Sequence, residues 1–185
     1  MLSSHYQGTP YDPYAATASE RGIYRPIGVN RNDFMALLQM RPDVPEDFRA
    51  VEWLAFASNA FNTMVPFYAN VDSTPEYLSN TTGDVSTDNF YWASRLLAAM
   101  ADASYAKSVF HIERYTLSVG SKPTASSIPM TMPSAARPTP PPVPPCAPRQ
   151  RGIGRYGQAE TTDTLNKVLF ELSSGMKNAY SRSDA

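Results

Sequence analysis

The stretch VEWLAFASNAFNTMVPFYANV, Val51–Val71, decides the fold of this chain because it holds two short runs of strand-forming residues. VEWLAFA (Val51–Ala57) and TMVPFYANV (Thr63–Val71) are rich in aromatic and β-branched residues, which favour β-strands. Pro66 has no backbone N–H to donate to a neighbouring strand. The second strand is therefore predicted to lie at a sheet edge or beside a bulge.

A hairpin is predicted just before this stretch. In YRPIGVNRNDFMALLQMR, Tyr24–Arg41, two apolar runs flank the polar turn residues NRND. Pro42 and Pro45 then end the second arm. Residues 1–23 are rich in Tyr, Pro, Ser and Gly and are predicted to be loop.

Helical periodicity replaces the strand pattern further along the chain. Apolar residues recur every three to four positions, with Ser86 or Thr87 as the expected N-cap and a break expected near Ser104. These residues are Phe90, Ala93, Leu97 and Met100. Strands followed by helices indicate an α+β fold, with the helices laid on a sheet.

A second helix is expected near the C-terminus. Thr161 or Thr162 is its expected cap, and Asp163 would lie in its first turn, where an acid favours the helix dipole. One face of this helix collects five apolar residues: Leu165, Val168, Leu169, Leu172 and Met176.

Residues 120–157 differ in composition from the rest of the chain. Ten of the 17 prolines fall between Pro123 and Pro148, and no acidic residue occurs between Glu113 and Glu160. Such a stretch is predicted to be extended polyproline or disordered. Out-of-frame translation of G+C-rich coding DNA gives a similar composition, so a shifted reading frame is the favoured explanation, and a natural linker is the alternative.

Three functional interpretations of this segment are weaker. The PxxP spacing at Pro142–Pro145 has no basic residue in the flanking register that orients SH3 ligands. GIGRYG, residues 152–157, matches a dinucleotide loop, but a polyproline run precedes it where a strand is required. Cys146 as a nucleophile would need a base and a rigid pocket, which a disordered run does not supply.

Composition excludes several classes of function. The net charge of −1 gives no general attraction to nucleic acid, and no apolar run is long enough to span a bilayer. The start MLSSHYQGTPYDPY does not have the pattern of a signal peptide, and a single cysteine fits a reducing compartment, so a cytoplasmic location is expected. No metal-ligand cluster is found, and no cofactor is expected. His111 is expected to be structural, and Asp84 and Asp88 to favour a helix start.

Several long blocks resemble bacterial cysteine dipeptidases of the N-terminal-nucleophile hydrolase superfamily. They are LSSHYQGTPYDPY, the stretch from Tyr24 to Val71, TPEYLSNTTGDVSTDNFYWASRLLAAMADA and LNKVLFELSSGMKNAYSRSDA. The resemblance covers Leu2–Ser118 and about Gln158–Ala185, and it lapses across Gly120–Tyr156.

This resemblance implies a four-layer αββα enzyme that hydrolyses dipeptides without a cofactor. Its nucleophile would be a cysteine at the mature N-terminus, whose own α-amino group is the base, and water would release the acyl-enzyme. This sequence begins Met1-Leu2-Ser3, and Cys146 lies in the non-matching segment, so no catalytic residue is carried over. The blocks match the C-terminal part of such enzymes, so a fragment that is inactive alone is expected, from a parent that forms homo-oligomers.

The chain is accordingly divided into three parts. Residues 1–119 form a partial dipeptidase-like domain, 120–157 the proline-rich segment, and 158–185 a C-terminal helix of that domain. The substrate-binding residues predicted from SSHYQG and SNAFN are His5, Tyr6, Gln7, Asn59 and Asn62. The favoured explanation is nevertheless that they are turn and strand-end residues that satisfy backbone groups. The alternative function is a non-enzymatic interaction module that displays the proline-rich arm to a partner.

Overall fold

The computed structural model describes residues 17, 19, 27–28, 32–125 and 146–176. A three-stranded sheet comes first and the long helices follow, which confirms the predicted α+β class. The strands are β1 (Phe34–Met40), β2 (Ala50–Phe56) and β3 (Val65–Tyr68). The helices are α1 (Glu76–Ser79), α2 (Phe90–Ala103), α3 (Tyr105–Ala125) and α4 (Cys146–Ser174), with short 3₁₀ turns at η1 (Glu46–Phe48) and η2 (Asn59–Phe61).

The sheet is antiparallel in the order β1-β2-β3. β1 pairs with β2 over seven residues, from Phe34 opposite Phe56 to Met40 opposite Ala50. β2 is shifted by one residue from the strand predicted at Val51–Ala57. β3 lies inside the strand predicted at Thr63–Val71. β1 is the second arm of the predicted hairpin, whereas only residues 27 and 28 of the first arm belong to the described part of the chain.

Pro66 lies in the edge strand β3, as predicted. The open side of β3 is closed by one side chain, the fully buried amide of Gln150 on α4. Its Oε1 accepts the N–H of Tyr68 at 3.2 Å, and its Nε2 donates to the C=O of Pro66 at 3.0 Å. A side-chain amide thus takes the place of a fourth strand and satisfies two buried backbone groups.

The break expected near Ser104 is confirmed, because α2 ends at Ala103 and α3 begins at Tyr105. The predicted N-cap of α2 is wrong. Asn89 caps this helix instead, with its side chain accepting the N–H of Trp92 at 2.9 Å. Ser86 accepts the N–H of Asp88 in the preceding turn, so it satisfies a loop rather than the helix.

Helix α4 begins at Cys146, well before the cap predicted at Thr161 or Thr162. Pro148 falls in its first turn, where a missing N–H costs no helical hydrogen bond. Residues 120–125 and 146–157 of the proline-rich segment are therefore helical, and the other residues of that segment lie outside the described part. Of the predicted apolar face, Val168 is buried and Leu169 is exposed on α4, and Met176 lies exposed beyond the end of the helix.

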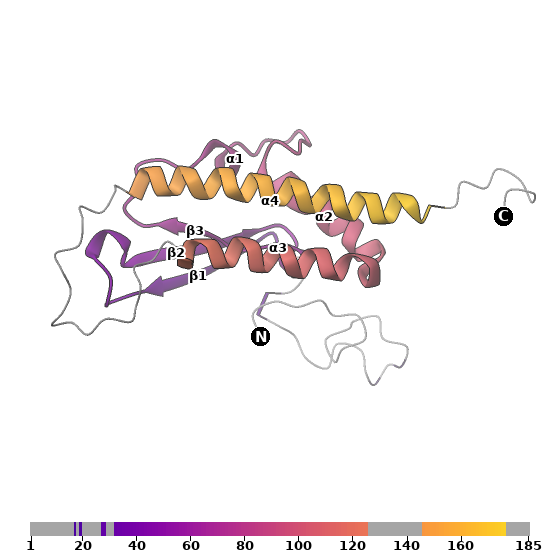
Figure 1. The fold of residues 1–185 in the computed structure, drawn as a ribbon, viewed down its shortest axis with the longest axis horizontal. Helices are drawn as coiled ribbons and strands as arrows, with labels where there is room; N and C mark the ends of the chain where they lie inside the picture. Colours follow the sequence, from indigo (N-terminus) through magenta and orange to yellow (C-terminus); the bar gives the residue numbers. More distant parts are fainter. Residues whose placement is uncertain (1–16, 18, 20–26, 29–31, 126–145, 177–185) are drawn as a thin grey trace, which may run out of the picture.

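Figure 1 shows α4 running along nearly the whole length of the described structure, with α3 beside it and the sheet at the end where α4 begins. The main core forms where α2, α3 and α4 meet the sheet. Its most buried members include Phe61, Phe90, Leu97, Tyr115 and Val168. Ile153 on α4 packs against both this core and a smaller cluster around Phe48 and Tyr68.

Candidate functional site

A cleft of about 580 Å³ lies between α1 with its flanking loops and the first turns of α4. The loop before α1 and the residues up to Asp88 form one wall, and α4 forms the other. The lining residues are Ser73, Thr74, Pro75, Glu76, Tyr77, Asn80, Asp88, Arg151, Gly154, Arg155 and Gln158. The cleft therefore joins two parts of the chain that lie about 70 residues apart in the sequence.

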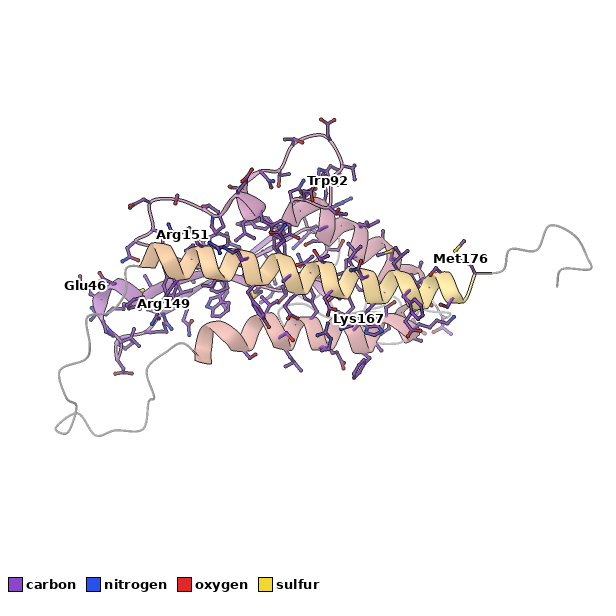
Figure 2. All side chains as sticks on the ribbon, turned by 45° about the horizontal axis from the view of Figure 1, so that its top comes forward. Glu46, Trp92, Arg149, Arg151, Lys167 and Met176 are labelled. Atoms are coloured by element: carbon purple, nitrogen blue, oxygen red, sulfur yellow. The ribbon has the colours of Figure 1, made fainter. Side chains whose placement is uncertain are left out.

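The two walls carry opposite charges. Glu76 and Asp88 belong to the α1 side, and Arg151 and Arg155 project from α4 one turn apart. Among the described residues none of these four makes an ion pair. Figure 2 shows Arg151 on a different side of α4 from Arg149, whose guanidinium lies 4.6 Å from the ring centroid of Phe48. Such a cleft has the charges to hold a small ligand that carries both an ammonium and a carboxylate group.

The floor of the cleft is set by one glycine. A Cβ placed on Gly154 would lie 2.5 Å from Cβ of Pro75, closer than real carbon contacts allow. Gly154 is buried, and its missing side chain lets α4 approach the start of α1. The glycine therefore fixes the distance between the two walls.

Beneath the cleft lies a chain of buried hydroxyl groups. Thr161 donates to the C=O of Gly157 at 2.7 Å, so its single proton is used and Tyr115 must be the donor in the 2.7 Å contact between the two hydroxyls. Burial raises the pKa of Tyr115, and it raises the pKa of Tyr77 to about 12. Both phenols are therefore neutral at physiological pH, and neither is a ready proton acceptor.

The predicted substrate-binding residues are not brought to this cleft. His5, Tyr6 and Gln7 lie outside the described residues, and Asn59 begins η2. Asn62 is buried, donates to the C=O of Phe56 and accepts the N–H of Thr63 at 2.7 Å. Its amide is thus engaged by the backbone of the corner after β2, which favours the structural explanation. Substrate binding by these five residues remains a prediction.

The other residues singled out in the sequence have ordinary structural settings. GIGRYG lies inside α4, so its three glycines do not form a phosphate loop before a helix. His111 lies on α3 with its Nε2 3.9 Å from the Glu171 carboxylate. In the described part of the chain no three His, Cys, Asp or Glu side chains come together as a metal site would require, and no helix there has the length and apolar character needed to cross a membrane.

Sequence reasoning missed the cleft. Arg151 and Arg155 are four residues apart, a spacing that places them on one face of a helix. That pattern was available in the sequence, but the neighbouring prolines and glycines argued against a helix there. The position of Glu76 in the cleft could not be predicted from a helical pattern, because α1 is a single turn.

Comparison with known proteins defines the class first: the chain is related to peptidases. It belongs to peptidase family C69, whose family model matches residues 1–118. "Probable dipeptidase A" of Streptococcus pyogenes serotype M3 (strain SSI-1) is 40% identical over 186 residues, which cover 100% of this chain. "Dipeptidase" of Bifidobacterium longum (strain NCC 2705) is 49% identical over 122 residues, 65% of this chain, and "Dipeptidase A" of Lactobacillus helveticus is 46% identical over 105 residues, 56% of this chain.

The chain is much shorter than these relatives. The matched spans cover 39% of the Streptococcus relative, 23% of the Bifidobacterium relative and 22% of the Lactobacillus relative. The Streptococcus match runs through residues 120–157, where the resemblance was expected to lapse. Residues 149–157 also pack against the sheet and α1, so this part of the segment is integrated into the fold.

Proposed function

We propose that this chain is the C-terminal portion of a cysteine-type dipeptidase and is inactive by itself. The observation that carries the proposal is the match of the whole chain to 39% of a probable dipeptidase, together with membership of peptidase family C69. In this proposal the nucleophilic cysteine and its α-amino base belong to the part of the enzyme that this chain does not match.

The described residues support inactivity of the chain alone. The one cysteine, Cys146, is the first residue of α4. The imidazole of His111, one of the two histidines of the chain, faces Glu171 at 3.9 Å, on α3 and far along the sequence from Cys146. The contribution of this chain to the enzyme is a sheet, a helical layer and a charged cleft.

In the assembled enzyme we expect the cleft between α1 and α4 to contact the charged ends of a peptide. Glu76 and Asp88 would face an ammonium group, and Arg151 and Arg155 a carboxylate. His5, Tyr6, Gln7, Asn59 and Asn62 remain the sequence-based candidates for substrate contacts. The proline-rich arm is the runner-up function, and its Pro142–Pro145 spacing lies outside the described residues.

The proposal is tested with a chimera. The segment of the Streptococcus pyogenes relative that matches this chain is replaced by this chain, and dipeptide hydrolysis is followed by ninhydrin or by chromatography. We expect the isolated chain to be inactive and the chimera to hydrolyse dipeptides until a thiol-alkylating reagent is added. Arg151→Gln in the chimera should raise KM several-fold with kcat nearly unchanged, and Arg149→Gln is the matched control on the other side of α4.

Two results would overturn the proposal. One is hydrolysis by the isolated chain that disappears in Cys146→Ser, since the nucleophile would then lie in this chain. The other is a chimera with cooperative unfolding but no activity on any dipeptide. Equal loss of kcat in the two arginine variants would contradict substrate binding in the cleft. It would not contradict the proposal that this chain is part of a dipeptidase.

A further inference from the structure

The outer side of β1 has no partner strand among the residues that the structure describes, because β1 stands at the end of the sheet order. Its side chains are nevertheless those of a buried strand, FMALLQM. Phe34 is 54% exposed, Leu38 77% and Met40 68%. A long, uncharged, apolar edge of this kind is rare on a finished protein surface, where charged residues or proline normally protect it.

The exposed side chains continue the face that forms the core. In a strand every second side chain points to the same face, so Phe34, Leu38 and Met40 share a face with one another. The ring of Phe34 lies 5.9 Å from that of Phe56 on β2, which in turn packs edge-on against Phe90 of α2 at 5.8 Å. Among the described residues, this face is therefore joined to the core through Phe56, and it becomes exposed at Phe34, Leu38 and Met40 of β1.

The backbone of β1 is also ready to pair. The C=O of Asp33 accepts from Ala57, and the N–H of Arg41 donates to Arg49, so the odd-numbered residues bond toward β2. In an antiparallel strand the N–H and C=O of alternate residues point to opposite sides. Ala36, Leu38 and Met40 therefore direct their N–H and C=O groups toward the open edge.

The length comparison indicates what covers this edge. The Streptococcus relative has about three fifths of its sequence beyond the segment that matches this chain. That remainder is large enough to supply both a strand for the backbone groups and an apolar layer for the exposed face. A second copy of this chain would bring only another β1 strand to this edge. The part of the relative that lies outside the match would then have no strand edge to pair with.

We propose that the outer edge of β1 binds the part of a family C69 chain that this sequence does not match, by adding a strand along Ala36–Met40 and burying Leu38 and Met40. This inference rests on the proposed function. Strand addition gives the affinity, and the apolar side chains fix the register because a slip by one residue would expose them again.

The probe for the experiment is the Streptococcus pyogenes relative without the segment that this chain matches, and its binding to this full chain is measured by titration calorimetry. Leu38→Pro removes one N–H from the open edge and leaves the β2 side unchanged, so it should weaken binding at least tenfold. The double variant L38K/M40K retains all backbone groups and should weaken binding similarly. Near-ultraviolet circular dichroism checks that each variant keeps its fold.

The matched control places the same change elsewhere. Phe110 and Leu117 are exposed apolar residues on α3, 69% and 71% exposed, and F110K/L117K should bind as the unmodified chain does. Binding that survives both β1 changes but is lost in F110K/L117K would overturn the inference in favour of the helical face. A tight dimer of this chain that excludes the probe would overturn it in favour of a second copy. Because binding is read without activity, an inactive chimera with normal, β1-dependent binding would count against the proposed function alone.

Discussion

At the scale of single residues, the two neighbouring glycines of α4 have opposite environments. A Cβ on Gly154 would collide with the ring of Pro75, whereas a Cβ on Gly152 would have no atom within 4 Å. Both positions are helical, so backbone conformation does not distinguish them. The difference between them isolates the effect of close packing.

Gly154→Ala is therefore expected to lower the free energy of unfolding by about 1–3 kcal/mol, the range for overpacking a tight contact. Gly152→Ala is expected to raise it by up to about 1 kcal/mol, because alanine is the better helix former. Urea unfolding followed by circular dichroism measures both. Equal stabilisation by the two substitutions would show that α4 does not approach α1 as closely as described.

Local chemistry explains which residue roles were predictable. Pro66 at a sheet edge and the break at Ser104 follow from the covalent properties of proline and from the lapse of an apolar stripe. The cap at Asn89 was missed because Ser86 and Thr87 are equally good cap residues in the same loop. Gln150 was not predictable, since its role depends on two backbone groups more than 80 residues earlier.

At the scale of elements, α3 and α4 are joined by a cluster of charges. Arg114 on α3 contacts the carboxylates of Asp163 and Glu160 on α4, and Lys167 donates to Asp163 at 2.7 Å. Figure 2 shows Lys167 on the side of α4 that faces α3. Hydrogen bonds from Lys167 and Arg114 hold the pKa of Asp163 below its usual value.

The lowered pKa of Asp163 determines how its contribution to stability changes with pH. A carboxylate whose pKa is lowered by folding stabilises the fold above its unfolded pKa, about 3.9, and this contribution is lost as the pH falls through the folded pKa. Asp163→Asn should therefore lower the free energy of unfolding at pH 7 by less than about 1 kcal/mol, because the Arg114–Asp163 ion pair is partly exposed to solvent. The difference from the unmodified chain should become smaller as the pH falls below about 3.9, and should be smaller at pH 3 than at pH 7.

Urea titrations at pH 7, 5 and 3 measure this effect. Asp84→Asn, in an exposed loop, is the control and should change stability little at any of the three values. If the loss in Asp163→Asn were the same at pH 3 as at pH 7, the cause would be something other than the charge of this carboxylate.

Elements were predicted best where local pattern and tertiary packing agree. β2 and α2 have both a periodic apolar pattern and a buried face, so their residue ranges were nearly correct. The start of α4 was missed because CAPRQRGIGRYG has little helix propensity of its own. Its helical form depends on contacts with β3 and α1, which the sequence pattern does not contain.

At the scale of the whole molecule, α4 is the element that connects the others. It packs against α1, α2, α3 and β3. It supplies Gln150 to the sheet, Ile153 to both apolar clusters and Val168 to the main core. Removing it would uncover apolar surface on every layer at once.

A chain truncated after residue 145 is therefore expected to lose its cooperative urea transition, measured by tyrosine and tryptophan fluorescence. A peptide of residues 146–176 added in trans should restore the transition, and the same peptide with Gln150→Leu should restore it poorly, because two buried backbone groups would stay unpaired. A truncated chain that unfolds with the unchanged midpoint would contradict the central position of α4.

The hydrogen bonds of Gln150 also have a consequence for the order of events during biosynthesis. Tyr68 leaves the ribosome 82 residues ahead of the side chain that closes its edge. At roughly 5–20 residues per second, β3 is exposed for on the order of ten seconds before its partner is made. Such long sequence separations also slow folding in general. The nascent sheet is thus open at β3 throughout that interval, and chaperone binding during translation is expected to be strongest just before residue 150 emerges.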